Sequence, residues 1–338
     1  MATYRDAGVD LDQADRHVAL IADAVTSTWG PNVVGGFGGF ATGVTIPDGY
    51  TSPVLMMSTD GVGTKLELAR RTGRYEGVGH DLVAMCVDDL AAVGARPIAF
   101  TDYLAVGRLE PDRDTVIVAS VAAACSLAGC ALVGGETAEH PGVVDVGHVD
   151  LAGAALGIVE AGREIGGSLV DAGDVIIGVE SPNLRSNGFS LVRAVVDGRP
   201  LDATFPGDER SVGAVLLEPS VIYAPGVLDA ASTGFVHAFA HVTGGGIPGN
   251  LARVIPDGLG AEIDTGTWAR PNVFNVIQHW GAVPDDEMYR VFNMGIGYLA
   301  VVASDGIDAV VDAFGTRGHP THRIGTIVGG SSGVRLIG

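Results

Sequence analysis

Two parts of the chain share one pattern, in which an apolar strand leads through a polar turn containing glycine into a helix. The first lies at residues 53–72 and the second at residues 174–190. Glycine allows the backbone to turn sharply, and backbone amides at a helix start can converge on an anion. Strands also follow one another directly elsewhere, so an α+β fold fits the chain at least as well as a doubly wound parallel sheet.

The length of the chain predicts two domains. With 338 residues, 47% of them hydrophobic, the chain can bury two sizeable cores. A glycine-containing stretch separates the two patterns, so we expect an N-terminal domain over 1–168 and a C-terminal domain over 169–338. The expected helices cover 65–72, 80–93 and 115–129, and a further helix opens at 186–190. The expected strands cover 53–58, 97–103, 130–133, 150–159, 174–179, 291–293 and 324–328.

The formal net charge of −20 restricts the partners of this protein. A nucleic-acid-binding surface needs a stripe of basic residues, and the sequence contains no such stripe. Residues 115–135 carry no charge, yet they are rich in alanine, serine and glycine and have acidic flanks, which predicts a buried helix and strand rather than a membrane span. An anionic ligand must therefore be bound locally, by glycine amides, a few cations and a metal ion.

Cysteine usage favours the cytoplasm. Cys86, Cys125 and Cys130 lie among apolar residues without the spacing of a zinc or redox site, so we expect buried free thiols in a reducing compartment. The segment Met1–Asp6 has no basic stretch that leads into an apolar core, and no secretory signal is expected.

Lys65 is the only lysine of the chain, since arginine fills the other 19 of its 20 basic positions. It closes the glycine-containing turn 60–65. An ammonium group is a compact point charge and a guanidinium a broad planar fork, so a retained lysine indicates a dedicated role. We predict that this turn binds nucleotide phosphates and that Asp60 holds Mg²⁺; the alternative is an ordinary turn with a surface lysine. The predicted phosphate ligands are Gly61, Gly63, Thr64 and Lys65.

The helix expected over 80–93 carries three carboxylates, Asp81, Asp88 and Asp89, among apolar residues. Carboxylates beside a buried stripe are costly unless they bind a cation or hydrogen-bond donors. Aspartate is also a poor helix former, so we predict a metal-binding role for Asp88 and Asp89 in mid-helix. Asp81 has the simpler alternative of stabilising the helix N-terminus.

Two glycine segments add candidates from the N-terminal half. Glu136 lies in the segment 134–142 directly after a short strand, where a carboxylate is placed to bind a metal or to act as a general base; the alternative is an ordinary polar loop. The loop over 35–40, which contains Gly38 and Gly39, has glycine on both sides of an aromatic residue and is predicted to be a lid.

The C-terminal half contains a comparable candidate. His241 precedes the turn Thr243-Gly244-Gly245, whose glycines and following helix start are typical of an anion-binding nest. His241 is suited to donate a proton or to contact a phosphate. The alternative is a structural histidine, which is the commoner role for a histidine taken alone.

Taken together, these segments resemble the phosphoribosylformylglycinamidine cyclo-ligase family, also called AIR synthetases. The resemblance extends from residues 4–10 to about Ile327 and rests on many motifs in the same order, none of which is specific alone. The motifs cover residues 35–40, 60–65, 81–90, 134–142, 186–191, 241–250 and 292–297.

The resemblance implies two α+β domains of the AIR-synthetase type, with the N-terminal sheets of two chains forming a barrel across a homodimer. It implies ATP and Mg²⁺ as cofactors. It also implies a small phosphoribosyl substrate, formylglycinamidine ribonucleotide, which is closed to aminoimidazole ribonucleotide with release of ADP and phosphate in purine biosynthesis.

The resemblance also implies roles for the candidate residues. Asp60, Asp89 and Glu136 would serve Mg²⁺ or act as the general base, and Lys65 would contact the ATP phosphates. The residues expected to be catalytic are Lys65, Asp89, Glu136 and His241. The further groups expected to bind the nucleotide or face phosphates are Gly38, Gly39, Ser186, Asn187, Thr243, Gly244 and Gly245.

The chain departs from the family pattern at Asp88, where the family usually has Asn, and at Phe189, where it usually has Tyr. Two alternative functions also remain open. One alternative keeps the ATP-binding fold with another acceptor, as in selenophosphate synthetase, thiamine-phosphate kinase or formylglycinamidine synthase. The other is a nucleotide-binding regulator without catalysis, which would be expected to have lost Lys65, Asp89 or Glu136.

Overall fold

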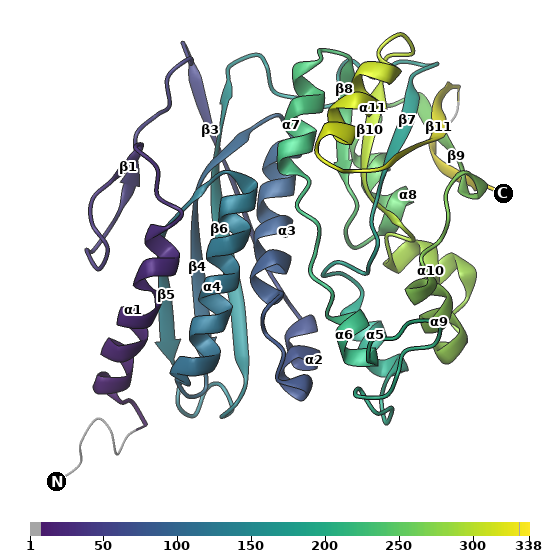
Figure 1. Cartoon of the computed structure of the whole chain (residues 1–338). Coiled ribbons are helices and arrows are strands. Elements are labelled where there is room, and N and C mark those ends of the chain that lie inside the picture. The colour runs from purple at the N-terminus through teal and green to yellow at the C-terminus, as the bar shows by residue number, and fades with distance from the viewer. Residues whose placement is uncertain (1–7, 331) are drawn as a thin grey trace.

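The computed structural model of the protein describes residues 8–330 and 332–338. Each half of the chain builds its own β-sheet, and the two sheets lie side by side with helix α3 (Val78–Ala92) between them (Figure 1). Helix α3 packs against strands of the first sheet and also against β8 and α7 of the second half. The expectation for Met1–Asp6, and most of the motif at 4–10, lie outside the described residues.

The N-terminal sheet has four strands in the order β3-β6-β4-β5. Pairing is antiparallel except between β4 and β5, which are parallel. A separate two-stranded hairpin, β1 and β2, carries the glycine loop 35–40 at its tip. The strands are β1 (Val33–Val34), β2 (Gly43–Val44), β3 (Pro53–Gly61), β4 (Arg96–Val106), β5 (Ala131–Glu139) and β6 (Val149–Glu160).

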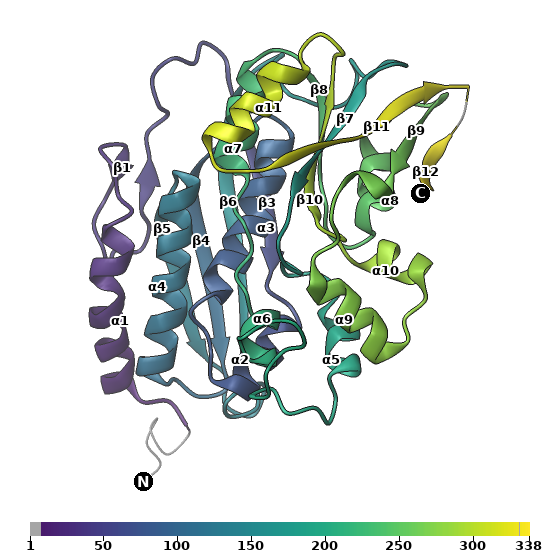
Figure 2. The same ribbon diagram turned by 45° about the vertical axis from the view of Figure 1, so that its right-hand side comes forward.

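Helices cover only one face of this sheet. Helices α3 and α4 (Pro111–Ala128) pack on it, α1 (Leu11–Thr26) packs on α4, and α2 (Lys65–Thr72) follows β3 (Figure 2). Gly79 allows α3 and α4 to approach closely, because a Cβ there would lie 2.1 Å from the backbone N of Val121. The opposite face of the sheet leaves Leu55, Met57 and Tyr103 exposed.

The C-terminal sheet has six strands in the order β12-β9-β11-β7-β10-β8, with only β12 and β9 parallel. Its central strands β7 and β10 are buried along almost their whole length, as their runs of Val, Ile and Leu require. The strands are β7 (Val175–Glu180), β8 (Val236–His241), β9 (Leu259–Asp264), β10 (Ile296–Val302), β11 (Thr321–Gly329) and β12 (Gly333–Ile337). The helices are α5 (Phe189–Val195), α6 (Val212–Leu216), α7 (Ala224–Ser232), α8 (Gly246–Leu251), α9 (Asn272–Gly281), α10 (Asp285–Val291) and α11 (Ile307–Thr316), with 3-10 turns at Ala252–Val254 and Thr265–Thr267.

The mixed α+β prediction is confirmed, whereas one predicted strand and one predicted turn are wrong. The strand expected at 291–293 is the end of α10 and a loop, and the strand begins only at Ile296. The strand expected at 130–133 continues to Glu139, so most of the expected turn 134–142 is strand. Pairing with β4 outweighs the low strand propensity of the glycines there. Beyond the strand expected at 324–328, a further strand forms over Gly333–Ile337.

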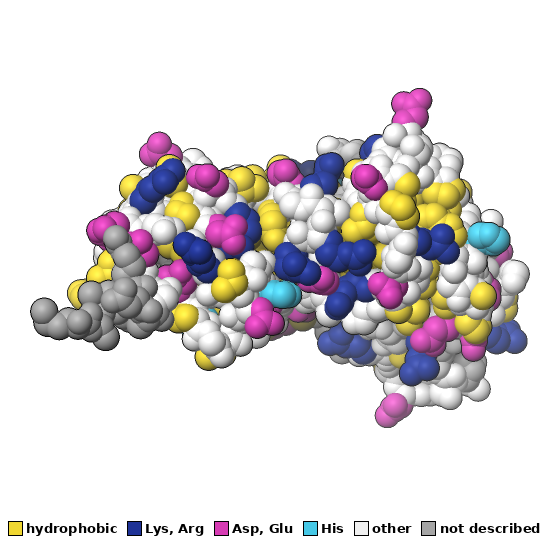
Figure 3. Space-filling view, turned by 90° about the horizontal axis from the view of Figure 1, so that it is seen from below, with side chains coloured by type: hydrophobic (Ala, Val, Ile, Leu, Met, Phe, Trp, Pro, Cys, Tyr) yellow, Lys and Arg dark blue, Asp and Glu magenta, His cyan; other side chains and the backbone are white. Residues whose placement is uncertain are grey.

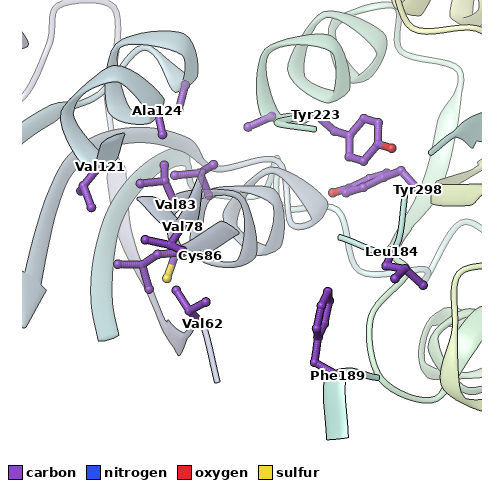
Figure 4. Close-up of a cluster of buried hydrophobic side chains, with 14 of the residues drawn as sticks. Val62, Val78, Val83, Cys86, Val121, Ala124, Leu184, Phe189, Tyr223 and Tyr298 are labelled. Atoms are coloured by element: carbon purple, nitrogen blue, oxygen red, sulfur yellow. The ribbon is translucent and has the colours of Figure 1, made fainter. Parts of the chain in front are cut away.

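A continuous apolar core joins the two halves. Figure 4 shows Val62, Val83 and Cys86 on one side of the junction, opposite residues of the C-terminal half such as Tyr223 and Tyr298. The three cysteines are free and buried, as predicted. Across the described part of the chain, none of the helices has the length and apolarity needed to cross a membrane.

Candidate active site

The turn after β3 places several predicted groups at the junction of the two halves. Gly63 has φ +68°, a conformation that favours glycine, and α2 begins two residues later. Gly63 and Thr64 are exposed, and so is Asp60, whose Oδ1 accepts from the Gly61 amide at 2.7 Å. These groups are therefore open to a ligand, as the turn pattern predicts.

The phosphate contact predicted for Lys65 requires a correction. Its side chain is buried, and Nζ lies 2.7 Å and 2.8 Å from the two carboxylate oxygens of Asp81. Nζ also donates to the carbonyls of Arg185 and Glu218, each at 2.9 Å. Because these acceptors occupy its hydrogens, the ammonium group holds the two halves together and does not point at an external phosphate. Burial lowers the pKa of Lys65, and the charge of Asp81 opposes this shift.

The three carboxylates of α3 have different environments. Asp81 and Asp88 are completely buried, whereas Asp89 is exposed. Asp81 lies in the first turn of α3, as its simpler alternative expected, and it also pairs with Lys65. Asp88 accepts from the guanidinium of Arg185 at 2.7 Å and from the backbone amides of Tyr223 and Ala224. The metal-ligand prediction for Asp88 is therefore corrected, because its oxygens are used by protein donors.

His241, at the end of β8, joins Asp89 to the C-terminal half. Its Nδ1 lies 2.9 Å from Asp89 Oδ1, and its Nε2 lies 3.0 Å from Nη2 of Arg185. The ring stacks on Tyr298, with centroids 5.6 Å apart and planes 24° apart. Both ring nitrogens therefore have partners within the protein, and the side chain is almost completely buried.

Asp60 and Asp89 both influence the pKa of the Cys86 thiol. The Cys86 thiol contacts the carbonyl of Gly153, which is the register partner of Asp60 on the neighbouring strand. Burial raises the pKa of the Cys86 thiol, and the negative charges of Asp60 and Asp89 raise it further. Two exposed carboxylates thus approach the junction from the end of β3 and from α3.

The predicted groups of the C-terminal half reach the same junction. Ser186 donates to the carbonyl of Val62 at 2.9 Å, which places it beside the turn after β3. A Cβ at Gly244 would lie 4.0 Å from Asn187 Oδ1, so the two glycine segments of this half adjoin. The predicted nest is shaped by Asn250, whose Nδ2 donates to the carbonyls of Thr243, Gly244 and Gly246.

Glu136 and the glycine loop lie apart from these residues. Residues 60 and 135 lie at the same level across the sheet, on the strands β3 and β5, and the strands β6 and β4 lie between them. Glu136, next to residue 135, is therefore about 14 Å from the turn at three strand spacings. Glu136, Gly38 and Gly39 instead line a cavity of about 420 Å³ between α1, β5 and the β1–β2 loop.

Asp102 is a residue of this cavity that the sequence reasoning missed. Its side chain lies over Gly135, where a Cβ would come within 2.2 Å of Asp102 Oδ1, so a larger residue at 135 would require the Asp102 side chain to move. Burial raises the pKa of Asp102 to about 7. An alternating strand pattern identifies Asp102 as inward-facing, but only the tertiary structure shows that its carboxyl group lacks a cation among the described residues.

Replacing Asp102 with Asn is expected to change the pH dependence of stability. The pKa of Asp102 is about 7 in the folded state and about 3.9 in the unfolded state, so the folded state binds the proton more tightly. The resulting stabilisation is fully present below about pH 3.9 and is lost as the pH rises through about 7. Between pH 5 and pH 8, wild type should therefore lose roughly 2 to 3 kcal/mol of unfolding free energy relative to Asp102→Asn. Urea denaturation of both proteins at both pH values measures this difference, and parallel curves would contradict the buried carboxyl.

The exposed carboxylates of the site suit a metal ion that binds partly to the protein and partly to a phosphate-containing ligand. Among the described residues, the structure contains no group of three or more His, Cys, Asp or Glu side chains that could hold a metal ion. Mg²⁺ usually binds proteins through one or two carboxylates and takes its other ligands from phosphates and water. Asp60 and Asp89 are exposed carboxylates that meet this requirement.

Comparison with known proteins shows the family of this chain. Residues 44–159 match the N-terminal domain and residues 171–337 the C-terminal domain of the AIR synthase related proteins. The phosphoribosylformylglycinamidine cyclo-ligase of Anaeromyxobacter dehalogenans (strain 2CP-C) is 49% identical over 98% of this chain and 97% of its own length. That of Sorangium cellulosum (strain So ce56) is 47% identical over 96% of this chain and 95% of its own length.

Solved structures share the fold at lower identity. Thiamine-monophosphate kinase from Stenotrophomonas maltophilia K279a has a TM-score of 0.68 and 20% identity, covering 96% of this chain and 95% of its own. The hydrogenase maturation protein HypE in complex with ATP has a TM-score of 0.65 and 19% identity, covering 92% of this chain and 86% of its own. The full-length sequence relatives are more specific, and the chain belongs to the phosphoribosylformylglycinamidine cyclo-ligase family, within the AIR synthase related proteins.

Proposed function

We propose that this protein closes formylglycinamidine ribonucleotide to 5-aminoimidazole ribonucleotide, with conversion of ATP to ADP and phosphate, in purine biosynthesis. The observation that carries the proposal is the 49% identity to a phosphoribosylformylglycinamidine cyclo-ligase over nearly the whole of both chains. The exposed carboxylates Asp60 and Asp89, and the glycine turns beside them, supply groups that this chemistry requires.

The reaction joins two steps. An amide oxygen is a poor leaving group, and transfer of the γ-phosphoryl group of ATP to the formyl oxygen converts it into a good one. The amidine nitrogen of the same substrate then attacks the activated carbon, and phosphate leaves as the ring closes. The protein must hold both reacting groups in line and offset the negative charge of the phosphates.

The proposed residue roles follow the geometry at the junction. Asp60 and Asp89 would hold Mg²⁺, which would screen the charge of the ATP phosphates. The amides of Gly61, Gly63 and Thr64 would bind phosphate oxygens at the start of α2. Ser186, Asn187, Thr243, Gly244 and Gly245 would face the remaining phosphate groups. Glu136, with Gly38 and Gly39, would contact the nucleotide from the cavity beside α1, or would serve as the general base.

Arginine side chains would help to attract these anions to an acidic protein. Seen from below, Arg side chains gather near the middle of the molecule, with acidic side chains among them (Figure 3). Arg70, Arg71 and Arg193 line a hollow together with Ser190, whose hydroxyl lies 3.3 Å from that of Thr64. The local positive charge thus adjoins the proposed phosphate-binding turn.

We also propose a homodimer in which the N-terminal sheets of two chains close into a barrel, with domains over 1–168 and 169–338. Met57 is 76% exposed and Leu55 52% exposed on the uncovered face of the sheet, which is unusual for large apolar side chains in a monomer. Closing the barrel would bury this face and bring an edge strand of one protomer against an edge strand of the other. A cytoplasmic location is proposed from the free cysteines.

Replacing Met57 with Asp should dissociate this dimer. A carboxylate buried without a partner should weaken association by at least about a hundredfold, equivalent to roughly 3 kcal/mol. Light scattering after size-exclusion chromatography measures the mass of each variant. Leu169→Asp is the control, because Leu169 is 67% exposed outside this sheet. A wild-type monomer, or an intact Met57→Asp dimer, would reject the proposed interface.

The test of the proposed function is turnover by the purified protein. Formylglycinamidine ribonucleotide, ATP and Mg²⁺ should give ADP and aminoimidazole ribonucleotide in equal amounts. Thiamine monophosphate, in place of the first substrate, should give no ADP above background. ADP release without the imidazole product would point to another acceptor, and ATP binding without turnover would point to a regulator.

A further inference from the structure

We propose that Arg185 is a positioning residue that fixes the tautomer of His241 and thereby the orientation of Asp89. This inference deepens the proposed function and rests on it for the role of Asp89. It concerns four side chains from both halves of the molecule, which form a chain of contacts in the order Asp88, Arg185, His241, Asp89. We call these four residues the junction network.

Arg185 is held in place from several directions. It is completely buried and has φ +59°, a backbone conformation that is uncommon for residues other than glycine. Its amide donates to Asn183 Oδ1 at 2.9 Å, and its carbonyl accepts from Lys65 Nζ at 2.9 Å. These two bonds support the strained backbone, which directs the guanidinium over the ring of Tyr223, 4.7 Å from the ring centroid.

The guanidinium determines which nitrogen of His241 carries a hydrogen. Nη2 of Arg185 lies 2.7 Å from Asp88 Oδ2 and 3.0 Å from His241 Nε2. A guanidinium has donors and no acceptor, so Nε2 must accept and can carry no hydrogen. The hydrogen of the neutral ring is then on Nδ1, which donates to Asp89 Oδ1 at 2.9 Å.

This arrangement has a consequence for Asp89. One oxygen is held by the imidazole, while half of the carboxylate side chain remains exposed at the junction. His241 therefore orients Asp89 and leaves the rest of the carboxylate available to a ligand. Residues in such supporting positions affect metal affinity or activity by 10- to 100-fold when they are replaced.

The junction network also depends on the docking of the two halves. Asp88 and Asp89 come from α3, Arg185 comes from the loop between β7 and α5, and His241 comes from β8. The tautomer of His241 is therefore set only when the C-terminal half lies against α3. Asp88 balances the charge of Arg185, which allows the guanidinium to be buried beside a neutral imidazole.

Nitrogen NMR of the protein labelled with ¹⁵N in histidine tests this assignment without ATP or Mg²⁺. The signal of His241 is identified by its loss in His241→Asn. In wild type, Nδ1 should carry the hydrogen and Nε2 should carry none. In Arg185→Met, a hydrogen should appear on Nε2, which then faces the Asp88 carboxylate 3.9 Å away. Arg185→Lys should retain the wild-type pattern, because an ammonium group also only donates.

Arg317→Met is the matched control, since Arg317 forms an exposed ion pair with Asp229. A hydrogen on Nε2 of His241 in wild type or in Arg185→Lys would overturn the proposal, and so would an unchanged spectrum in Arg185→Met. If Arg185→Met does not fold, the proposal is decided by whether Nε2 of His241 carries a hydrogen in wild type and in Arg185→Lys. In the turnover assay, kcat/KM for ATP should fall 10- to 100-fold in Arg185→Met and recover to within a few-fold of wild type in Arg185→Lys. Absence of turnover in wild type would reject the proposed function and leave the NMR result to decide the tautomer.

Discussion

Lys65→Met should lower the free energy of unfolding by about 3 to 5 kcal/mol, because it removes one partner of a buried ion pair. The variant leaves the Asp81 carboxylate buried without its cation and leaves the carbonyls of Arg185 and Glu218 without their donor. Urea denaturation of wild type and variant at the same pH measures the loss. The effect is expected on stability, since Nζ has no exposed surface from which to reach a phosphate.

A paired variant separates this structural role from ligand binding. Combining Lys65→Met with Asp81→Asn removes both buried charges, so the double variant should recover part of the stability lost in the single variant. Arg317→Met is the control, because Arg317 forms an exposed ion pair with Asp229 and has no part in the proposed binding site. A Lys65→Met protein of normal stability with a raised KM for ATP would restore the direct phosphate contact predicted from the sequence.

Asp89→Asn should reduce kcat/KM for ATP by about a hundredfold or more in the turnover assay, as losses of charge-stabilising groups commonly do. Asparagine has the same shape and can still accept from His241 Nδ1 through its side-chain oxygen, so the fold should be kept. What the variant loses is the negative charge of a half-exposed carboxylate at the junction. The dependence of the rate on Mg²⁺ concentration should shift to higher concentrations.

The control for this prediction is Asp312→Asn, an exposed carboxylate on α11 in the C-terminal half. It should leave both the rate and the Mg²⁺ dependence unchanged. A wild-type Mg²⁺ titration in Asp89→Asn would refute the ligand role of Asp89, whatever the change in rate. Unaltered unfolding curves for both variants would show that any effect arises at the site.

Local signals in the sequence predicted many of the elements. Helix α2 begins at Lys65 and ends at Thr72 as expected, because the glycine turn precedes it and Gly73 adopts the left-handed conformation that ends a helix. The uncharged stretch at 115–135 is a helix followed by a strand, as Pro111 and the alanine-rich composition predicted, although the helix is only partly buried. The extension of β5 through its glycines was missed, since it depends on pairing with β4, which is distant in sequence.

The candidate site was predicted less completely than the fold. The exposed groups Asp60, Gly63 and Thr64 lie where the turn pattern placed them. Asp81 and Asp88 were recognised as costly carboxylates, but the sequence did not reveal that Lys65 and Arg185 would compensate them. A buried charge requires a partner, and the identity of that partner depends on which distant segments of the chain pack together.

The sequence alone determined the glycine turns and several of the strands and helices beside them, because these features depend on neighbouring residues, and the motifs that they form identified the family. Only the tertiary structure decided which charged groups are buried in ion pairs and which remain exposed. Lys65 and Asp88 are buried in ion pairs where the two halves meet, while Asp60 and Asp89 remain exposed. The physical reason is that burial makes an unpaired charge costly, and burial is a property of the packed chain, which no short segment contains.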